Sequence, residues 1–129
     1  MDVSSLDSFF IDTVEALGPP QRATPLSGEQ VARLSAHLPQ SLMNFLRVYG
    51  IGEYFNRKLQ YCDASEFSSV LALVFGADPD FSHKDCHVVS YTAFGTLNCW
   101  SERHDYITID LVDMRITSPK LAPTQFVMP

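Results

Sequence analysis

The side chains best suited to chemistry are gathered in one polar stretch, residues 78–87. It holds carboxylates, imidazoles and a thiol, the groups that bind metal ions and transfer protons: Asp78, Asp80, His83, Asp85, Cys86 and His87. Their spacing matches no zinc-finger, His-Glu-x-x-His or calcium-loop pattern, because Asp78-x-Asp80 lacks the glycine and distal glutamate of a calcium loop. We therefore interpret the stretch as a solvated loop, with metal binding as the alternative, and expect neither a metal nor a cofactor.

Covalent catalysis has equally little support in the residue pattern. No serine stands in a Gly-x-Ser-x-Gly turn, and Gly50-Ile51-Gly52 is too short for a dinucleotide fingerprint and follows a predicted helix. Cys62 precedes a predicted helix N-terminus, which lowers a thiol pKa, whereas packing in a buried strand is the commoner role. We expect no enzyme activity, and a hydrolase acting through Cys62 or His87 is the last alternative.

Length and composition favour a single domain inside the cell. The 129 residues suffice for one hydrophobic core. No apolar run approaches the length of a membrane span, and the acidic N-terminus lacks the basic segment of a secretion signal. The three cysteines are odd in number and far apart, as expected of reduced, buried thiols. We therefore expect a cytoplasmic protein.

A core helix over residues 39–49 organises the predicted fold. One of its faces carries large apolar side chains at i, i+3, i+4 and i+7, namely Leu42, Phe45, Leu46 and Tyr49. Gly50 suits the left-handed position that ends a helix. An earlier helix begins after Ser27, which forms a capping-box pattern with Gln30. A further helix is expected over residues 6–17, with residues 21–26 as a polar connector.

Beyond residue 52 the pattern changes towards strands. Residues 54–55 and 59–61 are short, aromatic and alternating, and Asp63 with Glu66 forms a second capping-box pattern before a helix. Residues 86–118 follow a period close to two and are interrupted at Gly95 and at residues 102–105. The predicted fold class is α+β, with several helices packed on one face of an antiparallel β-meander.

The predicted domain comprises residues 1–118. Residues 119–129 contain three prolines and are expected to form a linker or tail that leads to a further C-terminal domain.

The order of these segments is similar to the GAD-like domain. The resemblance covers roughly residues 26–111 and rests on LSGEQVARL, LPQSLMNFLRVYGIGEY, CDASEFSSVLALVFGADPDF, CHVVSYTAFGTLNCWS and DYITIDL. The GAD-like domain is typically the N-terminal half of bacterial type VI secretion immunity proteins, which neutralise DNase effectors. The resemblance thus implies an immunity protein whose partner is a cognate nuclease toxin.

The distribution of charge agrees with a basic partner. The net charge is −6, but residues 59–114 hold nine acidic and two basic side chains, a net charge of −7. Such a field repels nucleic acid and attracts a basic protein, although an acidic surface also serves solubility alone. We expect no nucleic-acid and no membrane partner, and the sequence leaves the oligomeric state open.

The predicted partner-binding residues are acids of two loops and two aromatic anchors: Asp78, Asp80, Asp85, Glu102, Asp105, Tyr54 and Trp100. The acids would contact the basic residues with which a nuclease binds phosphate, and the aromatic side chains would add contact area if they are exposed. Packing in a hairpin is the alternative role of Trp100. The alternative function is a non-catalytic regulatory or scaffold module that binds a protein without a toxin partner.

Overall fold

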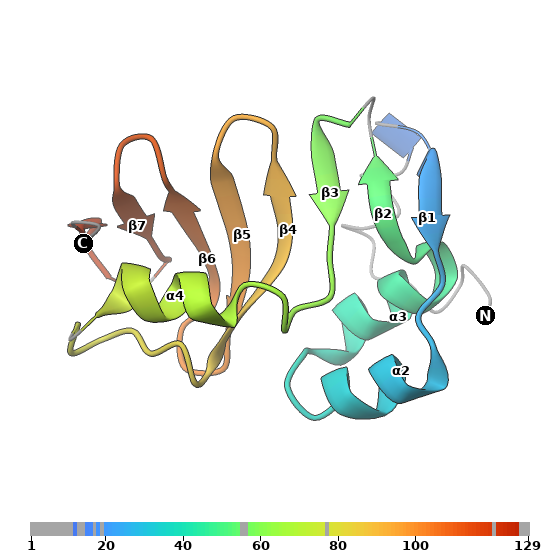
Figure 1. The fold of residues 1–129 in the computed structure, drawn as a ribbon, viewed down its shortest axis with the longest axis horizontal. Helices are drawn as coiled ribbons and strands as arrows, with labels where there is room; N and C mark the ends of the chain where they lie inside the picture. Colours follow the sequence, from blue (N-terminus) through green and yellow to red (C-terminus); the bar gives the residue numbers. More distant parts are fainter. Residues whose placement is uncertain are drawn as a thin grey trace. The chain divides into compact units, whose positions relative to one another are not determined.

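The computed structural model describes residues 12, 15–16, 18, 20–54, 57–76, 78–119 and 121–126. In these residues the chain forms three helices and eight strands and divides into two compact units, Met1–Tyr61 and Cys62–Pro129 (Figure 1). Most of the helix expected over residues 6–17 lies outside the described residues. Within the described ranges, no helix combines the length and the apolar character that crossing a membrane requires.

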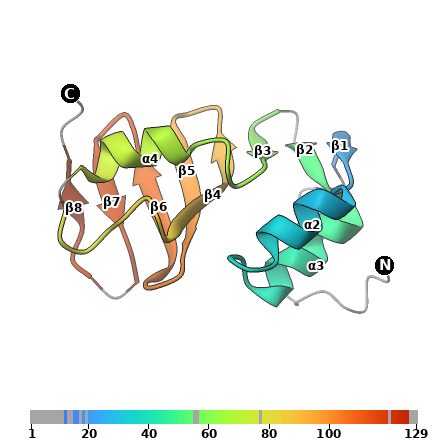
Figure 2. The same ribbon diagram turned by 60° about the horizontal axis from the view of Figure 1, so that its bottom comes forward.

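In the residues that the structure describes as complete elements, the first unit has three short antiparallel strands and two helices. The strands are β1 (Arg22–Thr24), β2 (Ile51–Tyr54) and β3 (Leu59–Tyr61), with β2 between the other two. The helices α2 (Gly28–Leu34) and α3 (Gln40–Tyr49) lie side by side (Figure 2). Strand β1 falls in the stretch expected to be a polar connector. It pairs through its backbone, which a polar three-residue segment does not reveal.

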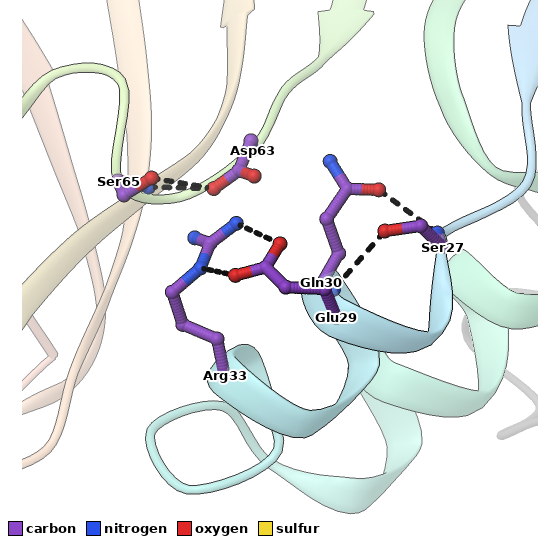
Figure 3. A network of polar contacts seen from close by, with 6 residues as sticks. All are labelled: Ser27, Glu29, Gln30, Arg33, Asp63 and Ser65. Carbon is purple, nitrogen blue, oxygen red and sulfur yellow. Dashed lines mark hydrogen bonds and ion pairs between the residues drawn. The ribbon is translucent and has the colours of Figure 1, made fainter.

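The start of α2 and the end of α3 agree with the sequence prediction, whereas α2 ends at Leu34 and is followed by turns before Pro39. The Ser27 hydroxyl accepts the Gln30 N–H at 3.2 Å, and the Gln30 side chain accepts the Ser27 N–H at 2.9 Å (Figure 3). Gly50 ends α3 with φ of 84°. The Phe45 ring packs 5.0 Å from that of Tyr61, so the predicted apolar face of α3 contacts the strands of its own unit.

The second unit is a meander with one helix. It comprises α4 (Ser68–Phe75), β4 (Cys86–Thr92), β5 (Thr96–Ser101), β6 (Asp105–Asp110), β7 (Arg115–Thr117) and β8 (Thr124–Gln125). Each strand pairs antiparallel with the next, and the β4–β5 register shifts between Val88 and Ser90. Side chains of α4, including Leu71 and Val74, share one buried cluster with the inward residues of β4 to β7, including Val88 and Ile109.

The class α+β with antiparallel strands is confirmed, and the packing of several helices on one face of a single meander stays a prediction. The capping box expected between Asp63 and Glu66 is wrong. The Asp63 carboxylate instead accepts the N–H and O–H of Ser65 at 3.0 and 2.8 Å (Figure 3). Residues 64–67 form turns, so α4 begins only at Ser68.

Part of the expected tail is folded. Residues 124–125 pair with β7, and Phe126 is buried in the core of the second unit. The domain boundary expected at residue 118 stays a prediction, but residues 124–126 belong to this unit and do not form a free linker.

Gly52 gives the first testable prediction. Its φ is 147°, and an added Cβ would overlap the Arg22 carbonyl oxygen of the paired strand. We expect Gly52→Ala to lower the free energy of unfolding, measured with urea, by about 3 kcal/mol or more. Gly76→Ala is the control, because Gly76 also has a positive φ but no atom within 4 Å of the added Cβ. It should cost only about 1 kcal/mol. Equal losses would contradict the close approach of β1 to β2.

Candidate functional site

Two loops of the second unit meet at one end of the meander. The Glu102 N–H donates to the Asp85 carbonyl at 2.8 Å, and the His104 Nε2 lies 2.6 Å from the Asp80 carbonyl oxygen. The His104 ring also packs 5.1 Å from that of Phe81, which is buried. These contacts hold the loop of residues 78–85 against the β5–β6 turn.

Four of the five predicted acids form what we call the acidic end: Asp80, Asp85, Glu102 and Asp105. Asp80, Glu102 and Asp105 are exposed, and Asp85 is half-buried. The fifth acid, Asp78, has an internal role, because its carboxylate accepts the N–H groups of Asp80 and Phe81 at 2.8 and 3.2 Å. The chain thus brings together acids that are up to 25 positions apart in the sequence.

The charge of this end is only partly balanced. Residues 78–105 contain five acids against Lys84 and Arg103. The His87 Nε2 lies 3.1 Å from a Glu102 carboxylate oxygen, so that carboxylate is shared with a neighbour. Among the described residues, no three of the candidate metal ligands in residues 78–87 lie close enough together to share an ion.

An aromatic pair adjoins the acidic end. Trp100 of β5 and Tyr106 of β6 are cross-strand neighbours, with their rings edge-on and 5.0 Å apart. Trp100 is half-buried, and 44% of Tyr106 is exposed. The next cross-strand pair joins Ser101 to Asp105, so the rings lie directly beside the acidic end. Trp100 therefore packs within the β5–β6 hairpin and also has exposed surface that a partner can contact.

Sequence reasoning missed Tyr106, although a signal for it was present. Ile107 and Ile109 are buried in the core, so the alternation of β6 places Tyr106 on the opposite face together with Thr108. An exposed tyrosine on a polar face is enriched at binding surfaces.

Tyr54 is not an exposed anchor. Only 4% of it is exposed, because its ring packs against those of Phe45 and Tyr61 at 5.9 and 5.0 Å. Its hydroxyl donates to the Gly50 carbonyl at 3.0 Å, and burial raises its pKa. Tyr54 belongs to the core of the first unit and offers no surface to a partner.

The three thiols, at Cys62, Cys86 and Cys99, are buried and free. Burial, followed by the charges of Glu66 and Asp63, raises the pKa of Cys62 to about 12. A hydrogen bond with Cys86, together with burial, raises the pKa of Cys99 well above its usual value. The idea of a lowered thiol pKa at Cys62 is therefore wrong. The thiol precedes a turn and not a helix N-terminus, and it donates to the Val88 carbonyl at 3.4 Å.

Comparison with known proteins identifies the family. The family model of the GAD-like domain matches residues 8–113, and the chain belongs to this family. None of the curated proteins compared with the chain matches it. The crystal structure of Atu4351 from Agrobacterium tumefaciens has a similar fold, with a TM-score of 0.79 and 21% sequence identity over 88% of this chain. The chain spans about half of that protein, since the match covers 53% of its length.

The buried thiol of Cys62 predicts a loss of stability at alkaline pH. Its folded pKa of about 12 exceeds the ordinary value of 9.0, so its contribution is complete below pH 9 and is lost as the pH rises towards 12. We expect the free energy of unfolding to fall above pH 9 by up to about 1.4 kcal/mol per pH unit for this thiol. The decline should be shallower in Cys62→Ala. Equal slopes in both proteins would show that the thiol is not kept neutral by folding.

Proposed function

We propose that this domain is an immunity protein. It binds a cognate type VI secretion DNase toxin in the cytoplasm and neutralises it by covering its basic active-site region. Membership in the GAD-like family supports the class of protein. The observation that carries the mode of action is the acidic end, where two loops are held together beside the aromatic pair.

Electrostatics gives this surface a means of recognition. A DNase binds phosphate through basic side chains, and carboxylates on a rigid protein surface can bind to the same basic side chains. Asp80, Glu102 and Asp105 are exposed, whereas Asp78 fixes the loop that carries Asp80. Association should therefore be fast and sensitive to salt.

The aromatic pair supplies affinity that charge alone does not. Tyrosine and tryptophan are the side chains most often found at the energetic centre of protein interfaces. Trp100 and Tyr106 are ordered by their mutual contact, so their binding to a partner costs little additional side-chain entropy. In this proposal the domain inhibits by occlusion and performs no reaction itself.

Charge substitutions at the acidic end test the electrostatic part. A variant that combines Asp80→Asn, Asp85→Asn, Glu102→Gln and Asp105→Asn keeps the hydrogen-bond acceptors but removes four charges. We expect its affinity for the cognate nuclease domain of this proposal, used with an inactivated active site, to fall at least about tenfold at low salt. The salt dependence of the association rate, measured by stopped-flow fluorescence, should become flatter.

The control for this variant is an acid outside the acidic end. Each of the four substitutions is also made alone and compared with Glu66→Gln, which removes the same single charge from an exposed turn residue. Wild-type protein should also rescue growth of cells that express the active nuclease. Absence of binding and of rescue by the wild-type protein would overturn the immunity function and leave a regulatory or scaffold module. Binding that the four-charge variant does not alter would overturn only the electrostatic contact.

Tyr106→Ala tests the aromatic contact. Because 44% of Tyr106 is exposed, its truncation removes contact area with little change to the core. We expect the dissociation constant for the same nuclease domain to rise about tenfold or more, chiefly through faster dissociation. Leu73→Ala on α4, where 50% of the residue is exposed, is the control and should bind like wild type, because α4 packs on the buried face of these strands. Equal affinity of Tyr106→Ala and wild type would remove the pair from the interface.

A further inference from the structure

The end of the meander opposite the acidic end exposes two large apolar side chains. Phe94 lies in the β4–β5 turn and is 72% exposed, and Val112 lies in the β6–β7 turn and is 73% exposed. These are the highest exposures among the large hydrophobic residues of the described ranges. Figure 1 shows both turns at the same end of the strands, away from the β5–β6 turn. We call Phe94 and Val112 the apolar tip.

Backbone contacts join the two turns directly. The Leu111 N–H donates to the Gly95 carbonyl at 2.9 Å. Gly95 has φ of 88°, and an added Cβ would lie 3.2 Å from a methyl carbon of Val112, so the valine side chain covers this glycine. Phe94 is the residue directly before the glycine that the Val112 side chain covers.

Each turn is also held by a side chain of its own. The Thr92 hydroxyl accepts the N–H groups of Phe94 and Thr96 at 3.3 Å each. The Asp110 carboxylate accepts those of Val112 and Asp113 at 2.9 and 3.0 Å. The apolar tip is thus presented by two turns, each of which is held by side-chain hydrogen bonds to its own backbone.

The charges around the apolar tip restrict what covers it. Residues 110–115 hold Asp110, Asp113 and Arg115, a net charge of −1, with Asp110 and Arg115 as cross-strand neighbours, and residues 92–96 hold no charged side chain. A second copy of the chain placed on this tip by two-fold symmetry would bring the Asp113 side chains of both copies together. Two exposed side chains also fall far short of the roughly 800 Å² per partner that a stable interface buries. Anionic lipid is repelled by the same carboxylates.

We infer that the apolar tip is a second contact for a basic protein partner, which has an apolar recess flanked by cationic side chains. This inference rests on the proposed function and names the same nuclease as the occupant. Strand β5 has six residues and therefore spans about 20 Å, within the width of one interface of standard size. Such a partner would run along the polar face of β5 and β6, from the acidic end past Trp100 and Tyr106 to Val112.

Substitutions at the apolar tip test the inference against the same inactivated nuclease domain. Phe94→Ser and Val112→Ser alter exposed side chains, so we expect both variants to unfold at the same urea concentration as wild type. Each should weaken binding about tenfold, and the double variant further, by accelerating dissociation. The salt dependence of association should stay that of wild type. Leu73→Ser on α4, where 50% of the residue is exposed, is the control and should bind normally.

The outcomes separate this inference from the proposed function. If wild type binds and the double variant binds equally well, the apolar tip is not a contact, while the immunity function stands. If wild type does not bind, both fail. A dimer of the free protein that forms with rising concentration and is abolished by Phe94→Ser and Val112→Ser would also overturn the inference, because the occupant would then be a second copy.

Discussion

The alternation of side chains along β5 and β6 is the constraint on which the second unit depends. Leu97 and Cys99 of β5 and Ile107 and Ile109 of β6 are all buried in the cluster that α4 covers. Because successive residues of a strand point to opposite faces, this packing leaves the polar and aromatic residues on the other face. A slip of one residue would bury that face and expose the core. The register of the core thus also fixes the position of the binding surface.

The loops that connect the strands hold the charged and apolar side chains of the proposed contacts, and the paired strands fix where these loops lie. One end of the meander gathers carboxylates, because residues 78–85 and the β5–β6 turn are joined by the Glu102 to Asp85 hydrogen bond. The opposite end gathers apolar side chains, because Gly95 leaves room for Val112. Each end is assembled from two segments that are distant in sequence. Neither end therefore exists unless the strands between them are paired.

The sequence allowed a good part of this fold to be predicted, and the physical reasons are local. The capping box of Ser27 and Gln30, the end of α3 at Gly50 and the period of two from residue 86 are all encoded within a few residues. Strand β1 and the late start of α4 were missed. The first depends on pairing with β2, and the second on Asp63 bonding to Ser65 rather than capping a helix.

The candidate site was less accessible to prediction from sequence alone. Negative charge indicated the acids, but whether a carboxylate faces solvent or its own backbone, as in Asp78, depends on loop geometry. Tyr54 and Tyr106 are both strand tyrosines, yet one is buried and the other exposed. The alternation of β6 with Ile107 and Ile109 indicates the outward position of Tyr106, whereas the burial of Tyr54 depends on its packing against Phe45 and Tyr61.

The side-chain acceptors inside the turns have a consequence for how recognition can change over time. Asp78, Thr92, Ser101 and Asp110 already occupy main-chain N–H groups of their own loops. A partner therefore contacts these loops chiefly through their outward side chains, because these main-chain N–H groups already donate to side chains of the same loop. Exchanging those outward groups alters specificity while the loop conformation is retained. A new partner can thus be matched by a few surface replacements, and the folded frame beneath them need not be redesigned.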